Sequence, residues 1–234
     1  MHNLLSARAE DARSLDEYAE KDPHRSTFDY FVARSADDKD RIYQLRYSAY
    51  HGQDLIAPRM DQRLRDAHDD APGTFSLGVT DAGRLVSTIR LSVLHVARPA
   101  SANYAAFADH LGPMLQGGTT ITDISRLAVL CETTSARRRL IHYTLRLAEI
   151  FAAAWDTEYG AVAVRRSHVP FYRRYGFSIA SEPRPYSAMV VPLSLMLIHR
   201  DRRRRDVAAM PAHLLASVEE EHRMVAALSE TVRA

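Results

Sequence analysis

The feature that most constrains the fold is a long amphipathic stretch that lies between two short apolar stretches. Residues 135–154 place Leu140, Leu147 and Phe151 on one broad apolar face at helical spacing. The residues before them, 119–130, are rich in β-branched side chains, and residues 161–164 form a short apolar run of strand length. Helices interleaved with strands in this way pack on a sheet, so we expect an α/β chain of the α+β type with one mixed sheet.

The remaining patterns add strands and helices on both sides of this unit. Capping residues, alternation and turn residues mark their ends. The expected elements are a strand at 28–33, a helix at 37–50 opened by Ser35-Ala-Asp-Asp38, a short helix within 61–70 and a hairpin of 75–80 with 85–94. They continue with a short helix at 104–111, a short helix at 169–175 ended by Gly176, a last strand at 187–195 and an amphipathic helix at 212–232.

The length and the cysteine content bound the organisation of the chain. With 234 residues we expect one main core, divided as a helical arm (1–26), a core domain (27–198) and a basic run with a C-terminal amphipathic helix (199–234). The single Cys131 excludes an intramolecular disulfide and a cysteine zinc site, which favours the cytoplasm. The longest apolar stretch, 189–198, is half a membrane span.

Charge is unevenly distributed along the chain. The net charge of +2 is too small for a dedicated nucleic-acid binder, so we expect no nucleic-acid partner. Residues 1–72 nevertheless carry a net charge of −4, whereas 131–205 carry 14 arginines against 6 acidic residues, a net charge of +8. The arginine run at 200–205 is either a solvated surface or a peripheral contact with acidic lipid.

The segment Val169-Pro-Phe-Tyr-Arg-Arg-Tyr-Gly-Phe177 follows the short strand expected at 161–164. Together with the element order from 119 to 177, it resembles the GNAT superfamily of acyltransferases. That resemblance implies a GNAT fold with a central, mostly antiparallel sheet flanked by helices and, here, a helical C-terminal extension. It also implies that Tyr172 protonates the departing thiolate, as a phenol with a pKa near 10 can do. The alternative is a packing aromatic with a satisfied hydroxyl.

Four further motifs occur in an order that separates branches of this superfamily. They are Arg46-Tyr47-x-x-Tyr50, Asp66-x-x-Asp69, Ile89-Arg90-Leu91 and Asp123-Ile-Ser125-Arg126-Leu127. The set resembles the long-chain N-acyl amino acid synthases and the acyl-homoserine-lactone synthases over residues 28–195. This resemblance makes Arg46, Asp66, Asp69, Arg90 and Arg126 candidates for binding the acceptor substrate. The alternative for the Asp66 and Asp69 pair with Arg46 and Arg90 is that it closes a lid.

Asp123 stands where those families carry a glutamate. An amine must lose a proton to attack a thioester, and a carboxylate at the edge of the sheet is a suitable proton acceptor. Because its side chain is one methylene shorter, Asp123 would act through a water molecule. The alternative is an ion pair of Asp123 with Arg90 or Arg126. Backbone N–H groups of the same strand, from Leu127 to Val129, are expected to polarise the thioester carbonyl.

The turn that opens the long helix departs from the coenzyme A users of the superfamily. It reads Cys131-Glu-Thr-Thr-Ser-Ala-Arg-Arg-Arg139 and contains no glycine to cradle a pyrophosphate. Acyl carrier protein presents the same pantetheine thioester on one phosphate of an acidic protein, so it would need a cationic docking face. Arginine suits that purpose, with Ser135 as the helix N-cap. The candidates are Arg137, Arg138, Arg139, Arg165, Arg166, Arg173 and Arg174, and the alternative is a solvated surface.

Two other chemistries are set aside. Asp66, His68, Asp69 and Asp70 lie close together in the sequence, but no second cluster completes a ligand shell, so we expect no metal. A thiol nucleophile built from Cys131 with a histidine is disfavoured, since a lone cysteine at a strand end usually packs.

The sequence therefore predicts an N-acyltransferase without a tightly bound cofactor. It would move a long-chain fatty acyl group from acyl carrier protein to the α-amine of an amino acid or similar amine. The alternatives are an acetyl- or acyl-coenzyme A-dependent N-acetyltransferase, an acyl-homoserine-lactone synthase and a silent binding module of the same fold. The lactone synthase is disfavoured because the expected tryptophan after the first helix is missing, Trp155 being the only one. The oligomeric state stays open.

Overall fold

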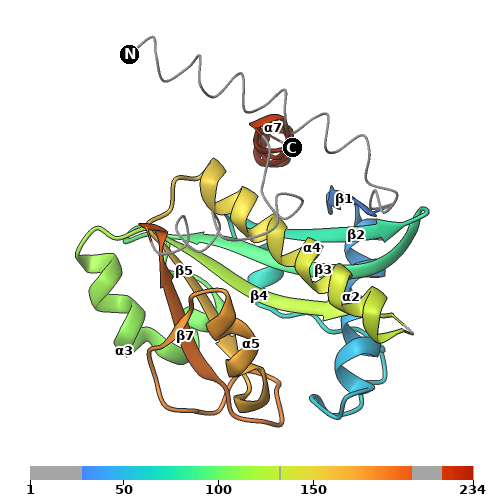
Figure 1. Ribbon diagram of the computed structural model, residues 1–234, viewed down its shortest axis with the longest axis horizontal. Helices are drawn as coiled ribbons and strands as arrows, with labels where there is room; N and C mark the ends of the chain where they lie inside the picture. The colour runs from blue at the N-terminus through green and yellow to red at the C-terminus, as the bar shows by residue number, and fades with distance from the viewer. Residues whose placement is uncertain (1–27, 132, 202–217, 234) are drawn as a thin grey trace.

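The computed structural model describes residues 28–131, 133–201 and 218–233, and its centre is a seven-stranded sheet (Figure 1). The strands are β1 (Phe28–Val32), β2 (Thr74–Asp81), β3 (Arg84–Leu94), β4 (Ile121–Val129), β5 (Tyr159–Val164), β6 (Ser178–Ile179) and β7 (Ser194–His199). Their order in the sheet is β1-β2-β3-β4-β5-β7-β6. Every neighbouring pair is antiparallel except β4 and β5, which are parallel and connected through a helix. The mixed, mostly antiparallel sheet is confirmed.

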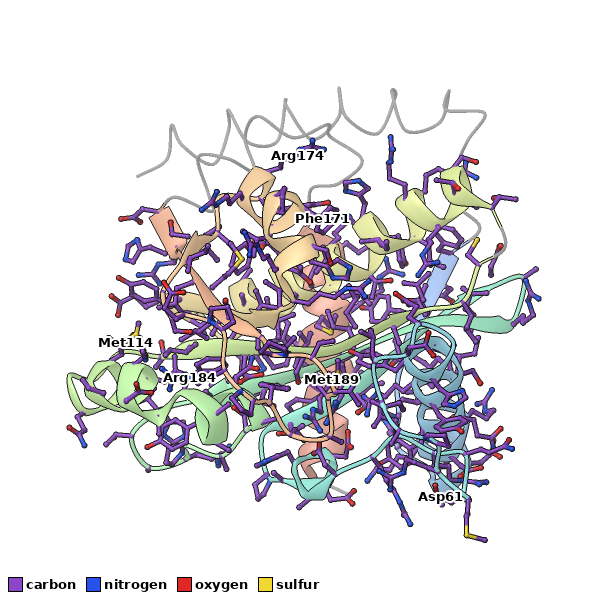
Figure 2. All side chains as sticks on the ribbon, turned by 90° about the horizontal axis from the view of Figure 1, so that it is seen from below. Asp61, Met114, Phe171, Arg174, Arg184 and Met189 are labelled. Atoms are coloured by element: carbon purple, nitrogen blue, oxygen red, sulfur yellow. The ribbon has the colours of Figure 1, made fainter. Side chains whose placement is uncertain are left out.

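Helices cover both faces of the sheet (Figure 2). On one face lie α4 (Thr134–Ala154) and α5 (Val169–Arg174), and on the other lie α2 (Ala36–His51) and α3 (Ala102–Gln116). The C-terminal helix α7 (Val218–Arg233) packs against α4 and β1 and buries Met224 and Leu228. None of the described helices combines the length and the apolar character that a membrane span needs.

The hairpin of β2 and β3 and the helix α2 form where the local sequence predicts them. Ala82 and Gly83 connect β2 to β3 with φ values of 48° and 78°, the backbone that two-residue hairpin turns require. Ser35 caps α2 and accepts a hydrogen bond from the Asp38 backbone N–H at 3.0 Å, while Asp38 accepts from the Ser35 N–H at 3.2 Å. This reciprocal pair is the predicted capping box.

A bulge in β4 separates this strand from β5. Thr88 and Arg90 of β3 face Ala128 and Ser125, so two residues of β4 stand opposite one residue of β3. Arg126 lies at the bulge with a φ of 53°. The pairing of β4 with β5 ends at Ile124 and Val162, although both strands continue beyond that pair. The continuing ends of β4 and β5 therefore lie apart, and a gap opens in the middle of the sheet.

Four local predictions were wrong or incomplete. The helix expected at 104–111 is the longer α3, because Ser101 caps it and its hydroxyl oxygen accepts a hydrogen bond from the Tyr104 N–H at 2.9 Å. Only a 3-10 turn, η1 (Ala67–Asp70), forms within 61–70. The strand expected at 187–195 is displaced to β7, since Pro192 cannot donate to a strand ladder. The N-cap of α4 is Thr133 rather than Ser135.

Three predicted segments fall wholly or partly outside the described residues. They are the helical arm at 1–26, most of the basic run at 200–205 and the first part of the helix at 212–232. Of the basic run, Arg200 is described, and its guanidinium binds Asp156 at 2.5 Å.

Candidate active site

The gap between β4 and β5 leads into a cavity of about 430 Å³. Apolar side chains of both strands form its walls, with contributions from α2, α4 and the loop that joins β6 to β7. The apolar wall includes Ile124, Leu127, Val129, Ile141, Val162 and Val164. Leu127 and Val129, which the sequence places beside the thioester carbonyl, thus line this cavity. The Tyr50 hydroxyl of α2 donates to the Leu127 carbonyl at 3.1 Å and supports the bulged strand from behind.

Cationic side chains occupy one part of the cavity wall. Arg137 of α4 and Arg165 after β5 both line the cavity, with His168 beside them. Arg165 donates to the Gln53 side-chain oxygen at 3.0 Å and to the His168 ring at 3.0 Å. Burial, together with the charges of Arg165 and Arg137, lowers the pKa of His168 to about 4. His168 is therefore neutral near pH 7, and the positive charge here is that of the two arginines.

The other arginines predicted to dock a carrier do not line the cavity. Arg138 and Arg139 are exposed on the first turns of α4, and Arg166, Arg173 and Arg174 are exposed on η2 (Arg166–His168) and α5. Figure 2 shows Arg174 on the α4 side of the sheet. The seven candidates thus divide into two that line the cavity and five on the surface.

On the opposite face of the sheet, the five residues expected to bind the acceptor form one buried network. Arg46 donates to Asp69 at 2.6 Å and to the Ser76 hydroxyl at 2.8 Å. Arg90 binds Asp66 through both terminal nitrogens, at 2.7 and 3.3 Å, and approaches Asp69 at 3.2 Å. The side chains that four separate motifs supply therefore lie in contact with one another.

Arg126 completes this network and connects it to the cavity. Its guanidinium binds the second oxygen of Asp66 at 2.5 Å, and the residue also lines the cavity. Three arginines share two carboxylates, which leaves one positive charge in excess in a nearly dry environment. The arginines Arg90 and Arg126 hold the pKa of Asp66 far below its usual range against the effect of burial, so the carboxylate stays ionised.

Asp123 does not belong to that network. It is fully buried on β4, and its carboxylate accepts a hydrogen bond of 2.5 Å from the Ser101 hydroxyl. Its other oxygen, Oδ1, has no hydrogen-bond partner within the described part of the chain. The alternative that Asp123 forms an ion pair with Arg90 or Arg126 is wrong, because those arginines bind Asp66 and Asp69 instead.

The environment of Asp123 changes its acidity in a way that fits proton transfer. Burial raises the pKa of Asp123 to about 6, although the Ser101 hydrogen bond and the charge of Arg90 act in the opposite direction. A carboxylate with this pKa is a stronger base than an exposed aspartate and is still ionised at pH 7. Asp123 is not part of the cavity wall, so it reaches a substrate only through an intervening group.

Tyr172 is placed by the short helix α5, which Gly176 ends with a φ of 86°. The side chain is buried, packs edge-on against Phe177 and lines the cavity. Burial raises the pKa of the Tyr172 phenol, so the group keeps its proton at neutral pH and can serve only as a proton donor. The neighbouring Tyr175 contacts His142 and does not line this cavity. It lines a second, smaller hollow, to which Tyr172 also contributes.

Sequence reasoning missed the residues behind Asp123. Ser101 and Asn103 begin α3, and Tyr186 lies in the loop between β6 and β7 and lines the cavity. The Tyr186 hydroxyl donates to the Asn103 side-chain oxygen at 2.6 Å. Ser101 carries a helix-capping signal that could have been recognised, whereas nothing near Tyr186 in the sequence marks it.

Several solved structures share this fold. The structure of FeeM, an N-acyl amino acid synthase from uncultured soil microbes, has a TM-score of 0.65 at 12% identity and covers 79% of this chain and 98% of FeeM. BjaI, a CoA-dependent acyl-homoserine lactone synthase crystallised with SAM and isopentyl-CoA, has a TM-score of 0.53 at 18% identity over 83% of this chain and 96% of its own. The acyl-homoserine lactone synthase LasI has a TM-score of 0.51 at 11% identity, over 73% of this chain and 88% of its own.

The sheet order, the bulged β4 and the cavity where it parts from β5 define a GNAT-fold acyltransferase. A profile of the N-acyl amino acid synthase FeeM family matches residues 41–199, and the chain belongs to that family. It is therefore an N-acyltransferase. A search by sequence among curated proteins finds no match.

Proposed function

We propose that the protein transfers a long-chain fatty acyl group from the thioester of acyl carrier protein to the α-amine of an amino acid. The observation that carries this proposal is the composition of the one cavity between β4 and β5. Its wall combines an apolar surface, two cationic side chains toward α4 and an arginine from the buried network. These three surfaces complement an acyl chain, a phosphate and a carboxylate respectively.

The donor thioester enters along the cationic part of the wall. Arg137 and Arg165 would bind the single phosphate of the pantetheine arm, and the exposed arginines of α4 and α5 would contact the acidic carrier. The continuing ends of β4 and β5 offer backbone groups beyond the Ile124–Val162 pair, to which the amides of the arm can bind as a strand would. The acyl chain then lies against the apolar wall.

The acceptor amino acid is held by its carboxylate. Arg126 is the arginine of the buried network that lines the cavity, and the network as a whole carries one positive charge in excess. A fork of parallel N–H donors suits a carboxylate and favours an amino acid over a simple amine. Arg46, Arg90, Asp66 and Asp69 hold Arg126 in place from behind.

The chemistry needs two proton transfers around one exchange of bonds. The neutral amine attacks the thioester carbon, the new C–N bond forms, and backbone N–H groups between Leu127 and Val129 stabilise the oxyanion. Asp123 accepts the proton that the amine loses, through a water molecule or another intervening group. The C–S bond then breaks, and Tyr172 donates its phenolic proton to the thiolate and later recovers one from solvent.

The test is incubation of the protein with a long-chain acyl-acyl carrier protein and a mixture of the amino acids, followed by mass spectrometry. N-acyl amino acids are the expected products. A parallel reaction with the matching acyl-coenzyme A tests the second candidate donor. The similarity to BjaI supports that candidate, because BjaI shares the fold and is CoA-dependent. Turnover of acyl-coenzyme A with no turnover of the carrier thioester would overturn the choice of donor.

We place the reaction in the cytoplasm, where acyl carrier protein is found and where a free thiol such as that of Cys131 stays reduced.

A further inference from the structure

Tyr186 is a buried cavity-wall residue to which neither the motifs nor the family match gives a role. It lies in the loop between β6 and β7, its side chain is 5% exposed, and its ring packs against Phe107 of α3 at 6.3 Å. Its hydroxyl oxygen is therefore the polar part of a side chain that is otherwise fixed by packing.

The hydrogen of this hydroxyl already has a partner. It is donated to the Asn103 side-chain oxygen at 2.6 Å, and the Asn103 amide nitrogen donates to the Ile124 carbonyl at 3.3 Å. This second bond fixes which end of the amide faces Tyr186, because the opposite orientation would place the Asn103 oxygen against a carbonyl oxygen. A hydroxyl has one hydrogen and two lone pairs, so Tyr186 can only accept from a further partner.

The surroundings keep Tyr186 in this state and place it next to the acceptor site. Burial and the nearby Asp123 carboxylate raise its pKa, which excludes an ionised phenolate at neutral pH. The next residue, Ser187, accepts a hydrogen bond from Arg126 at 3.5 Å. Arg126 and Tyr186 thus both line the cavity, and the guanidinium of Arg126 reaches the residue that follows Tyr186.

We propose that Tyr186 positions the acceptor amine, its oxygen accepting a hydrogen bond from the amine N–H because its own hydrogen is committed to Asn103. This inference rests on the proposed function for the direction of transfer, but it concerns the amine alone. Arg126 would bind the carboxylate of the same amino acid, so the two residues would recognise its two ends. Asn103 is a positioning residue that acts through Tyr186.

The experiment compares the steady-state kinetics of Tyr186→Phe with those of the wild type. The substitution removes only the oxygen and keeps the ring on Phe107. The KM for the amine is expected to rise about three- to tenfold, as for one lost hydrogen bond, with the KM for the acyl donor unchanged. Tyr104→Phe is the matched control, since Tyr104 packs in the same cluster without lining the cavity. Equal KM values for Tyr186→Phe and the wild type would overturn the inference.

A second variant separates this role from a merely structural one. Asn103→Ala releases the Tyr186 hydrogen and is expected to raise the amine KM by a smaller factor, with no further loss when it is combined with Tyr186→Phe. Additive losses in the double variant would contradict the coupling. If the wild type acylates amines but no amino acid, the proposed function fails, and the same kinetics with the accepted amine still decide the role of Tyr186. A wild type that acylates no amine overturns both.

Discussion

At the scale of single residues, the two groups proposed to transfer protons differ in how they meet the cavity. Tyr172 lines it directly and keeps its proton, whereas Asp123 is buried behind the wall with a raised pKa. In the proposed mechanism the proton donor touches the leaving group, and the base is one group away from the amine. This placement fits two separate proton transfers. Each residue can therefore be tested by its own signature.

Replacing Tyr172 with phenylalanine should lower kcat about 100- to 10,000-fold with little change in either KM, because the variant loses the acid and keeps the packing. Tyr175→Phe is the control, since the Tyr175 hydroxyl contacts His142 and the residue lines the second, smaller hollow and not the cavity. Its kcat should stay near that of the wild type. Initial rates of thiol release measure both variants, and equal rates in Tyr172→Phe and the wild type would remove the proposed acid.

The raised pKa of Asp123 gives a stability signature in addition to a kinetic one. Protonated Asp123 suits the buried site, so its contribution to stability is present below the unfolded pKa near 4 and is lost as the pH rises to about 6. Relative to Asp123→Asn, the wild type should lose on the order of 3 kcal/mol of unfolding free energy across that interval. Urea unfolding at pH 4, 5, 6 and 7 measures the difference.

The same residue should determine the acid limb of the rate profile. The value of kcat/KM is expected to fall below about pH 6 in the wild type as Asp123 takes up a proton, and this limb should be absent from the residual activity of Asp123→Asn. A limb that persists unchanged in the variant would assign it to another group.

At the scale of elements, the turn η1 presents Asp66 and Asp69 to three arginines from α2, β3 and β4. Asp69→Asn leaves Arg46 and Arg90 short of a carboxylate in a dry site, so unfolding free energy should fall by about 3 to 5 kcal/mol. Asp70→Asn is the matched neighbour: Asp70 is exposed and pairs with Lys39 on the surface, and its loss should change stability by less than about 1 kcal/mol. Denaturant titration of the two variants decides the comparison.

The start of α4 supplies the charge that a carrier protein would meet. Arg137→Glu should raise the KM for acyl-acyl carrier protein at least tenfold at low salt, and added salt should reduce the difference. Arg41→Glu makes the same change of charge on the exposed surface of α2, which covers the opposite face of the sheet from α4, and should leave this KM unaltered. Equal effects of the two reversals would mean that only net charge matters.

At the scale of the whole molecule, the sequence predicts the parts that depend on local chemistry. The capping box of Ser35, the turn at Gly83 and the apolar face of α4 depend on near neighbours, and all three form as expected. The residues of the buried network were predictable only as a set of motifs, and that they pair with one another was not. The ion pairs of the network join the carboxylates at η1 to arginines of β3 and β4. They depend on how the sheet brings distant segments together.

The remainder depends on packing that no local pattern encodes. The strand predicted at 187–195 falls mostly on the loop between β6 and β7, whose apolar side chains pack with α3 and line the cavity. The position of Tyr186 and its bond to Asn103 follow from that packing across 83 residues of sequence. A site of this kind becomes visible only when the chain is folded.

The bulge at Arg126 has a consequence for how this protein can change over evolutionary time. Because the extra residue reverses the alternation of β4, it decides which side chains beyond it face the cavity and which face α2. Deleting one residue there would turn every side chain beyond the bulge to the opposite face, so those facing the cavity and those facing α2 would change places. Substituting one of these residues alters only the contacts of that side chain. Length in this strand is therefore under tighter constraint than identity, and new substrate preferences should arise by substitution around a bulge of fixed length.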